Sequence, residues 1–198
     1  MEKPRRTGRN RLVWGLALIL PLAVLAGVIT VLFLSDRLGD HRIERQAELW
    51  AHERLIRAAE GVEQSPFVSD GCSGGMSALW RELSVRFPAA AEGWGERPPW
   101  EGCCIAHDRA YHNAGGARTA EESFYSRLGA DRALRACVSE YELQRGTRDA
   151  AALAEAMYVA VRAGGGPCTG LPWRWGYGYP ACHLGNALID AEIPALRR

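Results

Sequence analysis

Residues 103–111 read Cys-Cys-Ile-Ala-His-Asp-Arg-Ala-Tyr, and this stretch decides what the rest of the chain is expected to form. On a helix with about 3.6 residues per turn, Cys103, His107 and Tyr111 are spaced four residues apart and therefore share one face. The chain thus offers an imidazole with a cysteine one turn before it and a phenol one turn after it.

Cys104 and Asp108 form a second row on the same helix, so that a carboxylate lies beside the imidazole. The pattern Cys-Cys-x-x-His-Asp resembles the active-site helix of the secreted, calcium-dependent phospholipases A2. This resemblance implies a mainly α-helical, disulfide-stapled domain with two antiparallel core helices. It also implies a carboxylic ester hydrolase that cleaves the sn-2 ester of glycerophospholipids, releasing a fatty acid, by means of a histidine-activated water.

A second long helix is expected directly after the first. Thr119 and Glu122 have the spacing of a capping box, which starts a helix that continues to about Tyr141. The connection at Gly115-Gly116 is short, so we expect the two helices to run antiparallel.

The register of this helix pair can be tested from the spacing of its residues. If Cys103 bonds Cys137, a rise of about 1.5 Å per residue places Asp131 midway between His107 and Tyr111. One carboxylate would then accept hydrogen bonds from the imidazole and the phenol together. The alternative for Asp131 is a solvated acid on a helix face.

The phospholipase resemblance implies the same arrangement. The segment around Asp131 resembles the second helix of that family, in which an Asp six residues before a Cys orients the catalytic His. A disulfide common in the family would join positions 110 and 130. Both positions are alanine here, so the two cysteines of that disulfide are absent together. The implied roles are His107 as catalytic base, Asp131 as its partner and Tyr111 as the residue that holds Asp131.

Residues 67–75, Phe-Val-Ser-Asp-Gly-Cys-Ser-Gly-Gly, resemble the calcium loop of the same family. The resemblance implies a Ca²⁺ site in which Gly71, Ser73 and Gly75 supply carbonyl oxygens and Asp108 supplies a carboxylate, an all-oxygen set that suits calcium. However, Ser73 stands where the family usually has Gly, and the downstream part of the loop pattern is absent. These departures motivate the alternative of a catalytically inactive, membrane-tethered domain that binds lipid or a partner.

An uncharged, apolar segment covers residues 12–34, and its 23 residues suffice to cross a hydrocarbon core of about 30 Å. No small-residue cleavage site follows it, which favours an uncleaved anchor over a signal peptide. The alternative is a buried helix of a soluble domain. Basic residues precede the segment and place the N-terminus in the cytoplasm; they are Lys3, Arg5, Arg6, Arg9 and Arg11.

This topology gives the expected domain organisation. A basic cytoplasmic tail (1–11) leads to the transmembrane anchor (12–34), an amphipathic helical stalk (35–64) and the extracytoplasmic domain (65–198), which is periplasmic or extracellular. The stalk helix is expected to pack on its own domain or on a partner through a periodic stripe of Ile43, Ala47, Trp50 and Arg54, with Leu55 and Ile56 nearby. The partner implied for the whole chain is a phospholipid membrane. The formal net charge of +1 gives no indication of nucleic-acid binding.

All six cysteines follow the apolar segment, and an even number in an oxidising compartment indicates three disulfides. A zinc site made of Cys103, Cys104, His107 and His112 is the alternative. The phospholipase resemblance, with one pair left over for the C-terminal tail, implies the pairs Cys72–Cys104, Cys103–Cys137 and Cys168–Cys182.

Further helices are expected at 77–87 and 149–163, with an aromatic loop at 167–182 and no convincing strand. Bacterial, membrane-anchored members of the family share His-Asp-x-x-Tyr followed by Gly-Gly and a Trp/Tyr-rich tail. In this tail Trp173, Trp175 and Tyr177 are expected either to enter the lipid interface or to pack in the core. The remaining histidines, expected on the surface, are His41, His52, His112 and His183.

Overall fold

The structure is a computed structural model that describes residues 23, 24, 26–32, 34–69, 71, 72, 98, 100–145 and 150–182. The chain divides into two compact units, Met1–Ile43 and Glu44–Arg198. The expected helix at 77–87 and the loop residues Ser73 and Gly75 lie outside the described residues, as does most of the predicted anchor.

The first unit is helical from residue 23 to residue 38 wherever it is described. The helix ends at Gly39, whose positive φ of 65° is readily adopted by glycine. The Asp40 N–H then donates to the Ser35 carbonyl at 3.1 Å. Within the described part of the chain, we find no helix that combines the length and the apolar character needed to cross a membrane.

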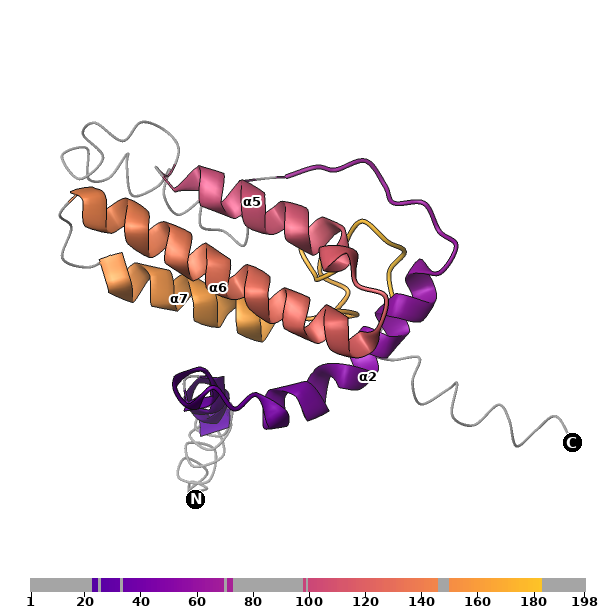
Figure 1. Ribbon diagram of the computed structural model, residues 1–198, viewed down its shortest axis with the longest axis horizontal. Helices are drawn as coiled ribbons and strands as arrows, with labels where there is room; N and C mark the ends of the chain where they lie inside the picture. Colours follow the sequence, from indigo (N-terminus) through magenta and orange to yellow (C-terminus); the bar gives the residue numbers. More distant parts are fainter. Residues whose placement is uncertain are drawn as a thin grey trace, which may run out of the picture. The chain divides into compact units, whose positions relative to one another are not determined.

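The second unit is built from α-helices (Figure 1). It contains α5 (Glu101–His112), α6 (Ala120–Arg145) and α7 (Ala150–Gly164), with a short 3-10 helix, η1 (Ala114–Gly116), between α5 and α6. Helix α6 packs against both α5 and α7. These bounds confirm the expected mainly helical fold, and no strand occurs among the residues described. Helix α6 runs four residues beyond the expected end at Tyr141.

The turn between α5 and α6 brings the two helices together as an antiparallel pair. Ala114, Gly115 and Gly116 have φ angles of 51°, 65° and 68°, so three successive residues adopt the left-handed conformation that reverses the chain. The predicted capping box then starts α6, because the Glu122 N–H donates to Thr119 Oγ1 and the Thr119 N–H donates to the Glu122 carboxylate, each at 3.2 Å.

All three predicted disulfides are present: Cys72–Cys104, Cys103–Cys137 and Cys168–Cys182. Cys103–Cys137 joins α5 to α6 with a Cα–Cα distance of 5.8 Å, and Cys72–Cys104 ties the preceding loop to α5. The zinc alternative is wrong, because Cys103 and Cys104 are both oxidised and supply no thiolate.

Two apolar clusters flank the α5–α6 pair. The first fills the space between α5, α6 and α7 and consists of Cys72, Trp100, Cys103, Cys104, Leu134, Val138, Ala154 and Met157. The second lies at the other end of α5 and consists of Leu55, Tyr111, Ala114, Cys168, Trp175 and Cys182.

Helix α2 (Arg42–Ala59) contributes to the second cluster, but not through the expected face. Ile43 and Trp50 of the predicted stripe are 69% and 42% exposed. The residues that α2 buries are Glu44, Ala51, His52 and Leu55. Since the second unit begins at Glu44, the division of the structure falls inside the predicted stalk and not at its end, residue 64.

The surface assignment of the histidines is wrong at three positions. His41, His52 and His112 are buried, and His183 lies outside the described residues. His52 Nδ1 lies 2.8 Å from Ser123 Oγ, and His112 Nε2 lies 2.8 Å from the Ser65 carbonyl oxygen. The contact of His52 therefore links α2 to α6, and the contact of His112 links α5 to the loop before it.

Candidate active site

The His107 imidazole meets the Asp131 carboxylate across the α5–α6 interface. Nε2 of His107 lies 2.8 Å from Oδ1 of Asp131, and both side chains are buried. The expected register is therefore confirmed, whereas the alternative of a solvated Asp131 is wrong. Because a neutral imidazole has one N–H, this contact assigns the proton to Nε2 and leaves Nδ1 as the acceptor.

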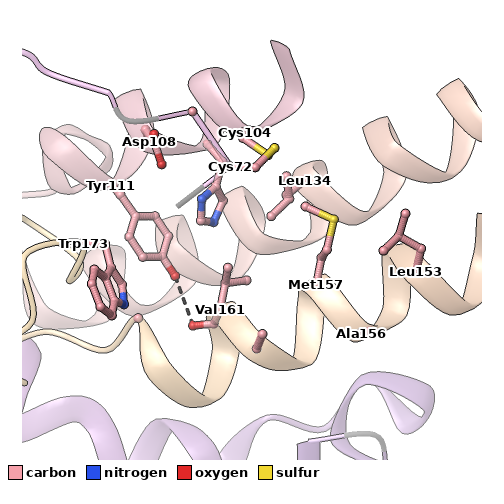
Figure 2. Close-up of a pocket in the computed structure, with 14 residues that line it drawn as sticks. Cys72, Cys104, Asp108, Tyr111, Leu134, Leu153, Ala156, Met157, Val161 and Trp173 are labelled. Atoms are coloured by element: carbon pink, nitrogen blue, oxygen red, sulfur yellow. Dashed lines mark hydrogen bonds between the residues drawn. A yellow bond between two sulfur atoms is a disulfide. The ribbon is translucent and has the colours of Figure 1, made fainter. Parts of the chain in front are cut away.

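Tyr111 completes the predicted arrangement one turn further along α5. Its hydroxyl donates to the same oxygen, Oδ1 of Asp131, at 2.8 Å, and its ring stacks on the His107 ring with centroids 4.1 Å apart. The Val161 carbonyl lies 3.4 Å from the same hydroxyl, a longer contact for its single proton (Figure 2). Burial raises the pKa of the Tyr111 phenol far above its usual value, so Tyr111 acts here as a neutral donor.

Asp131 is held in its ionised form. Burial by itself would raise the pKa of its carboxyl. The hydrogen bond from His107 and the charges of Arg127 and Arg162 outweigh this effect and hold the pKa below its usual range. Consequently Asp131 accepts the hydrogen bond from His107 and fixes the orientation of the imidazole. It does not act as an acid toward His107.

The other face of His107 lines a pocket. Its Nδ1 has no hydrogen-bond partner among the described residues, and the pocket measures about 260 Å³. One end of this pocket is polar and is formed by Gly71, His107, Asp108 and Tyr111. The remaining wall is mostly apolar and includes Leu134, Leu153, Met157, Val161 and Trp173 (Figure 2).

The loop before Cys72 is tied to Asp108. The Ser69 hydroxyl donates to Oδ2 of Asp108 at 2.6 Å and accepts from the Gly71 N–H at 3.1 Å. Gly71 has a φ of 76°, and a β-carbon there would lie 2.6 Å from a carboxylate oxygen of Glu101. The positive φ therefore favours glycine at this position, since the Glu101 side chain could move away from a β-carbon.

Asp108 and Gly71 are the described members of the predicted calcium site. Asp108 is a buried carboxylate at the polar end of the pocket, and Gly71 lies beside it in the same wall. Carboxylate oxygen is a ligand type that suits a hard cation such as Ca²⁺. The described residues contain no group of three or more His, Cys, Asp or Glu side chains able to hold a metal ion.

Five residues at the site were not anticipated: Glu44, Glu48, His52, Arg127 and Arg162. They surround the far side of Asp131 and are buried or mostly buried. One stripe of α2 carries Glu44, Glu48, His52 and Leu55. This spacing was the feature of the sequence from which a shared buried face could have been predicted. It was missed because glutamates usually mark a solvated face.

The aromatic residues of the tail differ in burial. Trp175 is fully buried and donates its indole N–H to Ser123 Oγ at 2.9 Å, so an interfacial position for this residue is wrong. Tyr177 is half-buried, and its hydroxyl donates to the Val68 carbonyl at 2.8 Å. Trp173 is 40% exposed and lies beside Tyr111 in the pocket wall (Figure 2).

Comparison with known proteins found no match: no protein-family model, no curated protein and no solved structure matches the chain. The likeness to the phospholipases A2 therefore rests on the residues and motifs given above.

Proposed function

We propose that the chain hydrolyses the sn-2 ester of glycerophospholipids in a calcium-dependent reaction, with His107 activating a water. The observation that carries this proposal is the pairing of His107 Nε2 with Asp131, which leaves Nδ1 available at the polar end of an apolar pocket. A base, a carboxylate that orients it and a site for an apolar chain are what ester hydrolysis of a lipid requires.

The proton transfer is assigned to His107. Nδ1 accepts a proton from a water as the oxygen attacks the ester carbonyl, and the resulting imidazolium returns that proton to the leaving alcohol. Asp131 holds the ring in the required tautomer and stabilises the imidazolium, while Tyr111 donates to Asp131 and prevents it from turning away. Burial of Asp131 strengthens this electrostatic support because little solvent competes for the carboxylate.

The pocket supports a lipid substrate. Beyond the polar end, the side chains Leu153, Ala156 and Met157 of α7 face Leu134 of α6 (Figure 2). An acyl chain placed along this wall replaces water on apolar surface, which is favourable at roughly 25 cal/mol for each Å² buried. The ester of that chain would lie at the polar end, next to His107.

Asp108, together with backbone carbonyls at Gly71, Ser73 and Gly75, is the proposed ligand set for Ca²⁺. When bound, the cation supplies positive charge for the lipid phosphate and for the oxygen of the attacked carbonyl. Asp108 directly follows His107 in the sequence, so the carboxylate and the base lie on the same turn of α5. The predicted anchor at 12–34 would keep this site beside a membrane and raise the effective substrate concentration.

The test is fatty-acid release by the full chain from phospholipid vesicles whose sn-1 and sn-2 chains differ. We expect release of the sn-2 chain, its loss with a calcium chelator and a decrease of about a hundredfold or more in His107→Gln. His112→Gln is the matched control, because it removes another buried imidazole from α5 that does not line the pocket. Vesicle binding without hydrolysis in the native chain would instead support the inactive lipid-binding domain.

A further inference from the structure

The two oxygens of Asp131 face different partners. Oδ1 accepts from His107 and Tyr111, whereas Oδ2 lies 3.2 Å from Nη1 of Arg162 and 3.9 Å from Nε of Arg127. The side chains of Asp131, Arg127 and Arg162 have no exposed surface. The orientation of Oδ1 toward the imidazole thus depends on what holds the two guanidinium groups.

Helix α2 holds both of them. Nη2 of Arg162 donates to Glu44 Oε2 at 2.8 Å and to Glu48 Oε1 at 3.3 Å, and Nη1 of Arg127 donates to the other oxygen of Glu48. Arg127 Nη2 also donates to the carbonyls of Val161 and Arg162 at 2.8 and 2.7 Å. Three helices, α2, α6 and α7, therefore meet behind the carboxylate through hydrogen bonds that leave the arginines little freedom.

The carboxylates of this cluster outnumber its guanidinium groups. Three carboxylates, Asp131, Glu44 and Glu48, surround two guanidinium groups, which leaves one negative charge in excess. If Glu44 and Glu48 were absent, Asp131 would face two guanidinium groups that neither of these glutamates holds in place.

We propose that Glu44 and Glu48 are positioning residues for the His107–Asp131 pair, acting through Arg162 and Arg127. They fix Oδ2 of Asp131 so that Oδ1 remains directed at His107 Nε2. The inference rests on the proposed function, since it assigns these glutamates to the same proton transfer. It also makes the helix that follows the predicted anchor a part of the active site.

A purely structural role for the glutamates is the competing explanation. Buried ion pairs contribute little net stability relative to apolar residues of similar size, but removing one partner leaves an unpaired buried charge. Stability alone therefore does not separate the two explanations. The tautomer of His107 does, because it reports whether Asp131 still accepts from Nε2.

The test compares the native full chain with Glu48→Gln by ¹⁵N NMR of the histidine rings at constant pH, with vesicle hydrolysis measured in parallel. For the native chain we expect one His107 tautomer with the proton on Nε2. In E48Q we expect a mixture of the two tautomers and a decrease in kcat of about tenfold, with KM changed less than about twofold. KM should change little because Glu48 does not line the pocket.

Glu121→Gln is the matched control. Its carboxylate pairs with Arg45 at 2.8 Å and so joins α2 to α6, but the pair is partly exposed and has no contact with Asp131 among the described residues. This variant should keep the native tautomer and kcat. If E48Q does not fold, Glu44→Gln is measured in the same way, since it disturbs Arg162 and leaves Arg127 paired with Glu48.

The outcomes separate the two proposals. A native tautomer and a native kcat in a folded E48Q or E44Q would overturn the positioning role and leave the glutamates as structural residues. If the native chain releases no fatty acid, the proposed function fails. The NMR comparison still decides whether the glutamates position His107, because it does not depend on turnover.

Discussion

The hydroxyl of Tyr111 lies so close to Gly165 that a β-carbon at position 165 would stand 2.6 Å from it. Gly165 is the first residue after α7, and its N–H donates to the Val161 carbonyl at 2.8 Å. The residue that follows α7 therefore contacts the Tyr111 hydroxyl. This contact limits the position that the phenol can take relative to Asp131.

Gly165→Ala is expected to displace the Tyr111 ring. The new methyl group would meet the hydroxyl, a ring carbon and the Val161 carbonyl at 2.6–2.7 Å. Relief of this overlap should weaken the bond to Asp131, lower the unfolding free energy by about 1–3 kcal/mol and reduce kcat about tenfold. Urea unfolding and vesicle hydrolysis measure the two effects. Gly164→Ala is the control, since nothing lies within 4 Å of its added β-carbon.

Ala160→Phe is expected to shorten the acyl chain that the protein accepts. Ala156 and Ala160 lie one turn apart on α7, and both line the pocket, so a phenyl ring at 160 would fill space next to Val161. The expected result is a rise of about tenfold in KM for long-chain substrates and a smaller change for short-chain ones. Ala163→Phe adds the same ring at an exposed position of α7 outside the pocket and should leave the chain-length profile unchanged.

The stability of the fold is expected to decrease in acid because of Glu48. Burial by itself would raise the pKa of this carboxyl, but Arg127, His52 and Arg162 together lower it from 4.5 to about 2. A carboxyl whose pKa is lower in the folded state stabilises the fold above its unfolded pKa and loses that contribution as the pH falls. The loss should therefore occur between about pH 5 and pH 2 and amount to on the order of 2–3 kcal/mol.

Urea unfolding at pH 7, 4 and 3 measures this dependence. Glu48→Gln should make the unfolding free energy less dependent on pH in that range. Part of the dependence should remain because the pKa of Asp131 is also lowered. Glu121→Gln, whose side chain is 57% exposed, should retain the native pH dependence. If the unfolding free energy of E48Q and that of the native chain depended equally on pH, the assignment of the acid-induced loss to Glu48 would be contradicted.

Removal of α2 is expected to destroy the domain and not merely detach it. A chain that begins at residue 40 keeps all of α2, whereas a chain that begins at residue 65, the predicted domain boundary, lacks Glu44, Glu48 and Leu55. Among the described residues, Arg127 and Arg162 would then keep Asp131 alone as an anionic partner. Loss of one partner from a buried pair costs about 3–5 kcal/mol, a large part of a typical stability of about 5–15 kcal/mol.

Near-ultraviolet circular dichroism and thermal melts distinguish the two truncated chains. The longer one should show fixed aromatic packing and a cooperative transition. The shorter one should retain helix without a sharp transition. A cooperative melt in both chains would show that α2 is dispensable for folding, and the packing of Leu55 in the apolar cluster with Trp175 would then carry little energy.

Much of the site was predictable because its signals are local. The spacing of His107 and Tyr111 on α5 and the capping box at Thr119 depend only on helix geometry, and the Cys103–Cys137 bond then fixes the register of α6. Asp131 follows from that register without further information. The resemblance to the phospholipases supplied the cysteine pairs, among them Cys72–Cys104, which lies beside the loop whose Ser69 hydroxyl donates to Asp108.

The sequence by itself determined the helix pair, and with the Cys103–Cys137 pair it also determined the register that joins His107, Tyr111 and Asp131, since helix periodicity acts along one or two neighbouring helices. Only the tertiary structure decided that the acidic stripe of α2 faces inward. Glu44 pairs with Arg162, 118 residues further along the chain, and Glu48 pairs with Arg127, 79 residues away. A glutamate is buried only where such a partner compensates its charge, and no local pattern records which distant arginine folds back to meet it.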